Sequence, residues 1–153
     1  MKPGTRKTQV NLALFELPCA CQNLRRLTRI VTRIYDQELR KAGLESTQFG
    51  LLTALGSTGE VNQKRLSAGF AMDSTTLTRT LGLLLKQRWV QVRRGEDRRE
   101  RLFSLTQAGK RQLEAAQPFW ESAQQRLQRT VGGAHWKQMK ETVSRLTQAA
   151  AEE

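Results

Sequence analysis

Apolar residues recur at intervals of three and four positions near the start of the chain, which predicts one long amphipathic helix. Pro18 suits the first turn of this helix, and Gly43 is expected to end it. A second helix is expected over residues 47–56, capped by Ser46 or Thr47. The apolar stripe of the first helix consists of Leu24, Leu27, Val31, Ile34 and Tyr35.

The middle of the chain predicts a helix, a turn and a second helix. Asn62 can cap a short helix, Gly69 permits a tight turn, and Asp73 or Ser74 can cap a longer helix. The longer helix has a stripe that is expected to be buried, formed by Leu77, Leu81, Leu84 and Leu85.

Alternating apolar and polar residues follow over 89–92 and 101–105, which predicts two strands joined by a hairpin tip. The last third returns to helical spacing in two runs, which is typical of helices that pack on other helices. The first run is Leu113, Ala116, Trp120, Ala123, Leu127 and Thr130, and the second is Trp136, Met139, Val143, Leu146 and Ala150. The predicted fold is mainly α with a small β hairpin.

Composition indicates one domain over residues 1–153 and an anionic partner. Lys and Arg number 26 against 14 Asp and Glu, a net charge of +12, and 18 of the 26 are arginine. Arginine is favoured where a planar donor group meets phosphate or a narrow groove, so nucleic acid is the expected partner. The apolar patch at 12–17 is too short for an export signal, and no run is long enough to span a membrane. A cytoplasmic protein is therefore expected.

The longer helix of the central pair has the features of a helix that reads DNA. Its exposed N-terminal half carries short hydroxyls and one arginine, which can approach phosphates and base edges. An ordinary polar face is the alternative. The hairpin that follows the helix favours DNA, because this order defines a winged helix-turn-helix, whose basic wing can grip a minor groove or phosphate. The residues concerned are Ser74, Thr75, Thr76, Thr78 and Arg79.

The sequence resembles the MarR family of bacterial winged-helix regulators over roughly residues 12–150. The resemblance is carried by Asp97, Arg98 and Arg99 followed by Leu105 and Thr106, by "MDSTTLTR", and by "YDQELRKAGLESTQFGLL". It implies dimerisation helices at 12–42 and 107–150, a winged helix-turn-helix at 46–106, and a homodimer on double-stranded DNA. The implied function is a sequence-specific regulator, in the simplest case a repressor of a pseudo-palindromic operator. A non-specific DNA- or RNA-binding protein is the alternative.

The resemblance also implies that Arg99 enters the minor groove and that Asp97 orients it. A carboxylate two residues away can hold a guanidinium in one rotamer, which reduces the entropy lost on binding. Two departures are present. The wing is about two residues shorter than is usual, so Arg98 is a rival to Arg99, with Arg94 as a further wing contact. Arg88 stands where glycine is common, and a left-handed backbone there would cost about 1–2 kcal/mol.

Two features could carry a signal. Cys19 and Cys21 lie beside the N-terminus of the first helix and near Arg25 and Arg26, where thiol reactivity is expected to increase. Cys21 with Tyr35 resembles the register of the family's hydroperoxide-sensing branch. A buried inert pair is the alternative, and a metal site would need the partner's thiols. A ligand pocket with Phe49, Phe119 and Trp120 as walls is the second possibility. The sequence predicts no cofactor and no set of catalytic groups.

Overall fold

The computed structural model describes residues 18–97 and 100–151 of the chain. The helices are α1 (Ala20–Leu39), the 3₁₀ turn η2 (Arg40–Ala42), α2 (Ser46–Thr58), α3 (Gln63–Phe70), α4 (Ser74–Lys86), α5 (Gln107–Val131) and α6 (Gly133–Ala151). The strands are β1 (Val61–Asn62), β2 (Val90–Arg94) and β3 (Arg101–Leu105). This is the predicted fold class, mainly α with a small β hairpin.

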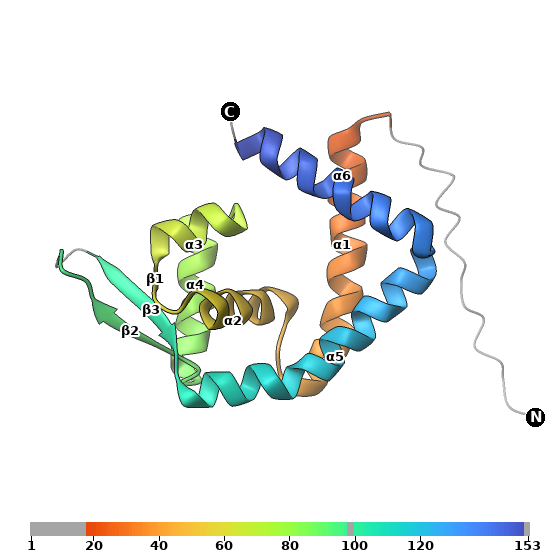
Figure 1. The fold of residues 1–153 in the computed structure, drawn as a ribbon. Helices are drawn as coiled ribbons and strands as arrows, with labels where there is room; N and C mark the ends of the chain where they lie inside the picture. The colour runs from red at the N-terminus through yellow and green to blue at the C-terminus, as the bar shows by residue number, and fades with distance from the viewer. Residues whose placement is uncertain (1–17, 98–99, 152–153) are drawn as a thin grey trace, which may run out of the picture.

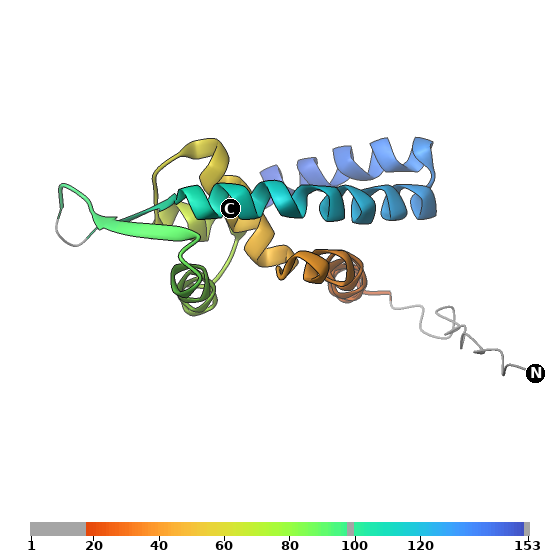
Figure 2. The same ribbon diagram turned by 90° about the horizontal axis from the view of Figure 1, so that it is seen from below.

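The elements form two groups that α5 connects (Figure 1). One group contains α2, α3, α4 and the sheet, and its β2–β3 hairpin projects away from the helices. The other group contains α1, α6 and the C-terminal part of α5. Figure 2 shows that the hairpin and the α5–α6 turn lie at opposite ends of an elongated chain. Along β2 every residue after Val90 is exposed.

The sheet is antiparallel, with the order β1-β3-β2. In the hairpin Val90 pairs with Leu105 and Arg94 with Arg101, so the predicted hairpin is confirmed. The two-residue strand β1, in which Val61 pairs with Phe103, was not predicted. It ties the segment before α3 to the centre of the sheet.

One hydrophobic core holds the first group together and extends to α5. Phe103, from the middle strand, is almost fully buried among leucines of α2 and α4. The predicted stripe of α4 is confirmed at Leu77, Leu81 and Leu84, whereas Leu85 is only partly buried. Ala116 of α5 is fully buried against the same core. The position of α5 is thus fixed by the winged module as well as by α1.

The residues at which the helices begin and end agree only in part with the prediction. Glu45, not Ser46 or Thr47, is the N-cap of α2, where its side chain and that of Gln48 form a reciprocal capping box. Gly69 lies inside α3, and the turn before α4 is made by Ala71, whose φ is 46°. Gly43 has a φ of 72° and ends the first helical segment as predicted.

Candidate nucleic-acid interface and effector pocket

Asp73 fixes the start of α4. Its carboxylate accepts the backbone N–H of Thr76 at 2.8 Å and the hydroxyl of Thr76 at 2.6 Å, which confirms one of the two predicted caps. These hydrogen bonds lower the pKa of Asp73, with the Thr76 hydroxyl as the largest cause. The cap orders the first turn, which is the part of the helix expected to meet DNA.

The predicted contact face of α4 is exposed along its N-terminal half. Ser74, Thr75, Thr78 and Arg79 line one shallow hollow of about 400 Å³ on its outer side. Thr76 is exposed as well, although its hydroxyl is engaged by Asp73. The structure therefore brings the five predicted α4 residues onto one accessible end of the helix.

The arginines of the wing do not have equivalent environments. Arg93 donates from Nε to Glu60 Oε1 at 2.6 Å and makes a second hydrogen bond to the other carboxylate oxygen. This pairing lowers the pKa of Glu60 and raises that of Arg93. Arg101 lies over the Phe103 ring, 5.4 Å from its centroid, and Arg94 is exposed at the end of β2.

The tip of the wing is only partly described. Asp97 is exposed there, and its backbone carbonyl accepts the N–H of Glu100 at 2.8 Å. Arg98 and Arg99 lie outside the described residues. The predicted pairing of Asp97 with Arg99 stays a prediction.

A side-chain hydrogen bond that was not predicted from the sequence connects the wing to the helix-turn-helix. Asn62 Oδ1 accepts the N–H of Arg65 and caps α3, while Asn62 Nδ2 donates to Glu100 Oε1 at 2.5 Å. Gly95 lies so close to Glu100 that a Cβ on residue 95 would come within 2.7 Å of Glu100 Oε2. The sequence indicated the cap, but the partner 38 residues away has no local signal.

A residue that follows α4 has a left-handed backbone conformation, at the position where a glycine is common in the family. Arg88 has a φ of 58°, between the last turn of α4 and β2. Its N–H donates to the carbonyl of Leu85 at 2.9 Å, and its own carbonyl accepts the Thr106 hydroxyl at 2.7 Å. The backbone conformation is thus held from both sides despite the cost of a Cβ there.

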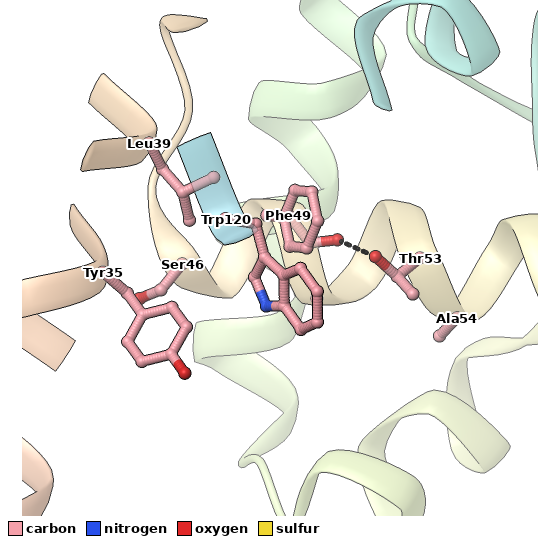
Figure 3. Close-up of a pocket in the computed structure, with 8 residues that line it drawn as sticks. Tyr35, Leu39, Ser46, Phe49, Thr53, Ala54 and Trp120 are labelled. Atoms are coloured by element: carbon pink, nitrogen blue, oxygen red, sulfur yellow. Dashed lines mark hydrogen bonds between the residues drawn. The ribbon is translucent and has the colours of Figure 1, made fainter. Parts of the chain in front are cut away.

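A pocket of about 360 Å³ lies between α1, α2 and α5 (Figure 3). Two of the predicted walls, Phe49 and Trp120, line it as a stacked pair with ring centroids 6.1 Å apart. Phe119, the third, packs partly buried against the core and does not line this pocket. Tyr35 forms another wall, and burial raises the pKa of its hydroxyl, which donates to Gln124 of α5. The full lining is Tyr35, Leu39, Ser46, Phe49, Gly50, Thr53, Ala54 and Trp120.

Both cysteines are exposed free thiols at the start of α1. In the single chain the two thiols are therefore not buried, whereas a buried, inert pair was the alternative to a reactive one. Cys21 and Tyr35 lie on one helix, about 21 Å apart along its axis at 1.5 Å per residue. A contact between a thiol and this tyrosine would need two copies of the chain.

The described part of the chain offers neither a metal cluster nor a membrane span. No group of three or more His, Cys, Asp or Glu side chains within residues 18–97 and 100–151 could hold a metal ion. Of the helices in those same ranges, none is long and apolar enough to cross a bilayer.

The α3–α4 pair followed by the β2–β3 hairpin defines a winged helix-turn-helix protein. Residues 42–100 match the MarR family profile. A curated relative, the uncharacterized HTH-type transcriptional regulator YwoH of Bacillus subtilis, is 34% identical over 86 residues, which cover 56% of this chain and 63% of YwoH. The chain thus spans less than two thirds of that relative.

Solved structures match over most of the chain. The transcriptional regulator MosR of M. tuberculosis, in a crystal structure with DNA, is 33% identical, with a TM-score of 0.77 over 86% of this chain and 96% of that chain. A mutant of E. coli MarR complexed with operator DNA has the same fold, with a TM-score of 0.75 at 18% identity over 82% and 91% of the two chains. The chain belongs to the MarR family of transcriptional regulators.

Proposed function

We propose that the protein is a sequence-specific DNA-binding repressor that acts as a homodimer on a pseudo-palindromic operator. The observation that carries the proposal is the exposed, capped N-terminal half of α4 beside a projecting wing. In this arrangement α4 enters a major groove, and the wing contacts the adjacent minor groove or phosphates. The DNA complex of MosR, at 33% identity, supports the same use of the fold.

The homodimer is supported by apolar surface on the two terminal helices. Leu24, Leu27 and Ile30 of α1 are 50%, 49% and 37% exposed, and Val143 and Leu146 of α6 are each 54% exposed. A second copy covering both helices would remove this surface from water. The two α4 helices would then meet half-sites one helical turn apart, on the order of 10 base pairs.

Sedimentation tests the dimer. Wild type is expected at twice the chain mass of 17.4 kDa. Leu146→Glu should shift it toward the monomer, because a carboxylate would be buried in the interface. Leu83→Glu is the matched control, since Leu83 of α4 is 47% exposed but lies outside the proposed interface. A monomeric wild type, or equal dissociation of both variants, would refute the proposed interface.

The groove contact of the wing is tested by two single substitutions. Arg99→Ala should weaken operator binding by roughly 1 to 3 kcal/mol, the usual worth of a specific arginine contact. Unchanged binding together with a loss on Arg98→Ala would assign the contact to Arg98 in this short wing. No effect from either substitution would contradict a tip contact.

Release of DNA is proposed to follow either a small ligand in the pocket or oxidation of Cys21. The pocket lies between the helices assigned to the dimer and α2 of the winged module, so a ligand there can change the spacing of the two α4 helices. Trp120→Ala should weaken the release that such a ligand causes. For the thiol, operator binding of wild type and Cys21→Ala is compared before and after hydroperoxide. Equal behaviour of the two would exclude sensing through Cys21.

Selection of genomic DNA fragments by the purified protein tests the proposal as a whole. Enrichment of a few fragments that share a palindromic element is expected, and binding should weaken steeply with salt. Equal recovery of all fragments would instead support the alternative of a non-specific nucleic-acid-binding protein. The neighbouring genes of enriched fragments would suggest the effector.

A further inference from the structure

The hydroxyl of Thr78 is held on two sides by hydrogen bonds within the protein. Its Oγ1 donates to the carbonyl oxygen of Ser74, one turn earlier in α4, at 2.7 Å. The same oxygen accepts the Nε2 amide of Gln63, from the first turn of α3, at 2.7 Å. A hydroxyl has one hydrogen to donate and two acceptor positions, so its donor and one acceptor position are occupied.

This occupation limits what Thr78 can offer to DNA. Phosphate oxygens, guanine N7 and O6, adenine N7 and thymine O4 are all acceptors and need a donor from the protein. Thr78 could supply a donor only by breaking its bond to Ser74. The link to Gln63 also holds the side chain in one rotamer, because Gln63 belongs to a neighbouring helix.

The γ-methyl group and one acceptor position of the hydroxyl are the parts of Thr78 that remain available. Thr78 lines two hollows, one with Gln63 on the α3 side and one with Ser74, Thr75 and Arg79 on the outer face of α4. The hydroxyl bonds to Gln63, which lines the first hollow, and to the carbonyl of Ser74, which lines the second. The γ-methyl has no hydrogen bond to make, and the second hollow lies on the face proposed to enter the major groove.

We infer that Thr78 is a specificity-determining residue that recognises the 5-methyl group of a thymine through its own γ-methyl, with Gln63 as the residue that positions it. Apolar contact with the thymine methyl is an established mode of readout in the major groove. The inference rests on the proposed function, since it assumes that α4 lies in that groove. Burial of one methyl is worth about 0.8 kcal/mol, or about fourfold in affinity for each half-site.

The experiment compares two substitutions that separate the methyl from the hydroxyl, on the operator obtained by selection. Thr78→Val keeps the methyl, and valine has one strongly preferred χ1 in a helix, so it does not need the Gln63 bond that selects one of the two rotamers of threonine. It should bind within about twofold of wild type. Thr78→Ser keeps the hydroxyl and should bind about fourfold more weakly per half-site. Thr58→Ser is the matched control, because Thr58 of α2 makes the same bond to the carbonyl four residues earlier, at 2.7 Å, and lies outside both the α4 face and the proposed dimer interface. It should leave affinity unchanged.

The DNA is varied in parallel by replacing each thymine of a half-site, one at a time, with deoxyuridine. One replacement should weaken wild type and Thr78→Val by about fourfold and leave Thr78→Ser unaffected, because that variant has already lost the contact. Gln63→Ala should reduce the discrimination between thymine and deoxyuridine at that position. If the free energy of unfolding of Gln63→Ala equals that of wild type, the reduced discrimination comes from the lost positioning of Thr78 and not from a less stable fold.

Two outcomes overturn the inference. If Thr78→Val loses affinity and Thr78→Ser does not, the hydroxyl makes the contact, for example by accepting from an adenine or cytosine amino group. If no deoxyuridine position distinguishes wild type from Thr78→Ser, Thr78 does not recognise a thymine methyl. Absence of any preferred fragment for wild type would be a failure of the proposed function and is seen before either variant is made.

Discussion

Gly109, in the first turn of α5, is expected to be essential because the backbone of Trp89, in the turn between α4 and β2, passes directly against it. It is buried, and a Cβ on this residue would lie 2.0 Å from the carbonyl oxygen of Trp89 and 3.2 Å from Leu105 Cδ2. Real Cβ atoms essentially never come within 3.0 Å of another atom, so α5 and the start of the wing would have to separate by about 1 Å or more. The obstacle is backbone and cannot rotate away.

The cost of Gly109→Ala can be assembled from the contacts that such a shift would break. The Trp89 carbonyl accepts the N–H of Thr106 at 3.0 Å, and Thr106 caps α5 by accepting the N–H of Gly109 at 3.0 Å. Overpacking of a well-packed site costs about 1–3 kcal/mol, and loss of an N-cap costs about 1 kcal/mol. We therefore expect destabilisation of about 2–4 kcal/mol, a large part of a typical total of about 5–15 kcal/mol.

Denaturant unfolding followed by circular dichroism measures this difference, at one protein concentration because dimerisation would contribute. Gly82→Ala is the matched control. Gly82 lies inside α4, and a Cβ added to it would meet nothing within 4 Å, so alanine should stabilise the protein by about 0.5–1 kcal/mol through helix propensity. The change in the free energy of unfolding is therefore expected to have opposite signs for Gly109→Ala and Gly82→Ala. A Gly109→Ala protein within about 0.5 kcal/mol of wild type would refute the steric reasoning.

Two further predictions concern the ends of α4. Arg88→Gly should raise the free energy of unfolding by about 0.5–1 kcal/mol, because relief of the left-handed strain, about 1–2 kcal/mol, exceeds the added entropy of the unfolded chain. Arg88→Ala keeps the Cβ and should not raise it. Equal melting temperatures of the two variants would contradict the strain at residue 88. Asp73 has a pKa below its ordinary value of 3.8, so its contribution is present above that pH and is lost as the pH falls through the lowered pKa. Melting temperatures of wild type and Asp73→Ala between about pH 6 and pH 2 should therefore converge at the acid end, and a constant difference would show that the carboxylate charge is not involved.

Periodicity was sufficient for the elements that bury one continuous face. The helices around Leu77 and Ala116 and the Val90–Leu105 hairpin all repeat over enough residues for the spacing to be read. The strand β1 has only two residues, and its pairing of Val61 with Phe103 depends on a strand 42 positions away. No local pattern could have indicated it.

The site was predictable where a single side chain acts on its own helix and not where partners come from different elements. Asp73 caps α4 through neighbours three residues away, which is a local rule. The hydrogen bond from Gln63 to Thr78 depends on how α3 packs on α4. Thr78 was therefore predicted as a DNA contact, but the hydrogen bonds that occupy its hydroxyl were not predicted. Phe119 illustrates the same limit, because helical spacing alone does not decide which of two adjacent aromatics faces a pocket.

The course of α5 explains how the pocket and the wing could communicate under the proposed function. Its first turn is fixed to the base of the wing through Gly109 and Thr106, and its middle carries Trp120, which stacks on Phe49 in the pocket. Pro118 interrupts the backbone hydrogen bonds of α5 two residues before Trp120, so the angle between the two halves of the helix can change there. A ligand that separates Trp120 from Phe49 would therefore change this angle and displace the wing relative to α2. Since both wings of a dimer must fit one DNA duplex at a fixed spacing, a small tilt at each pocket would be enough to weaken both contacts.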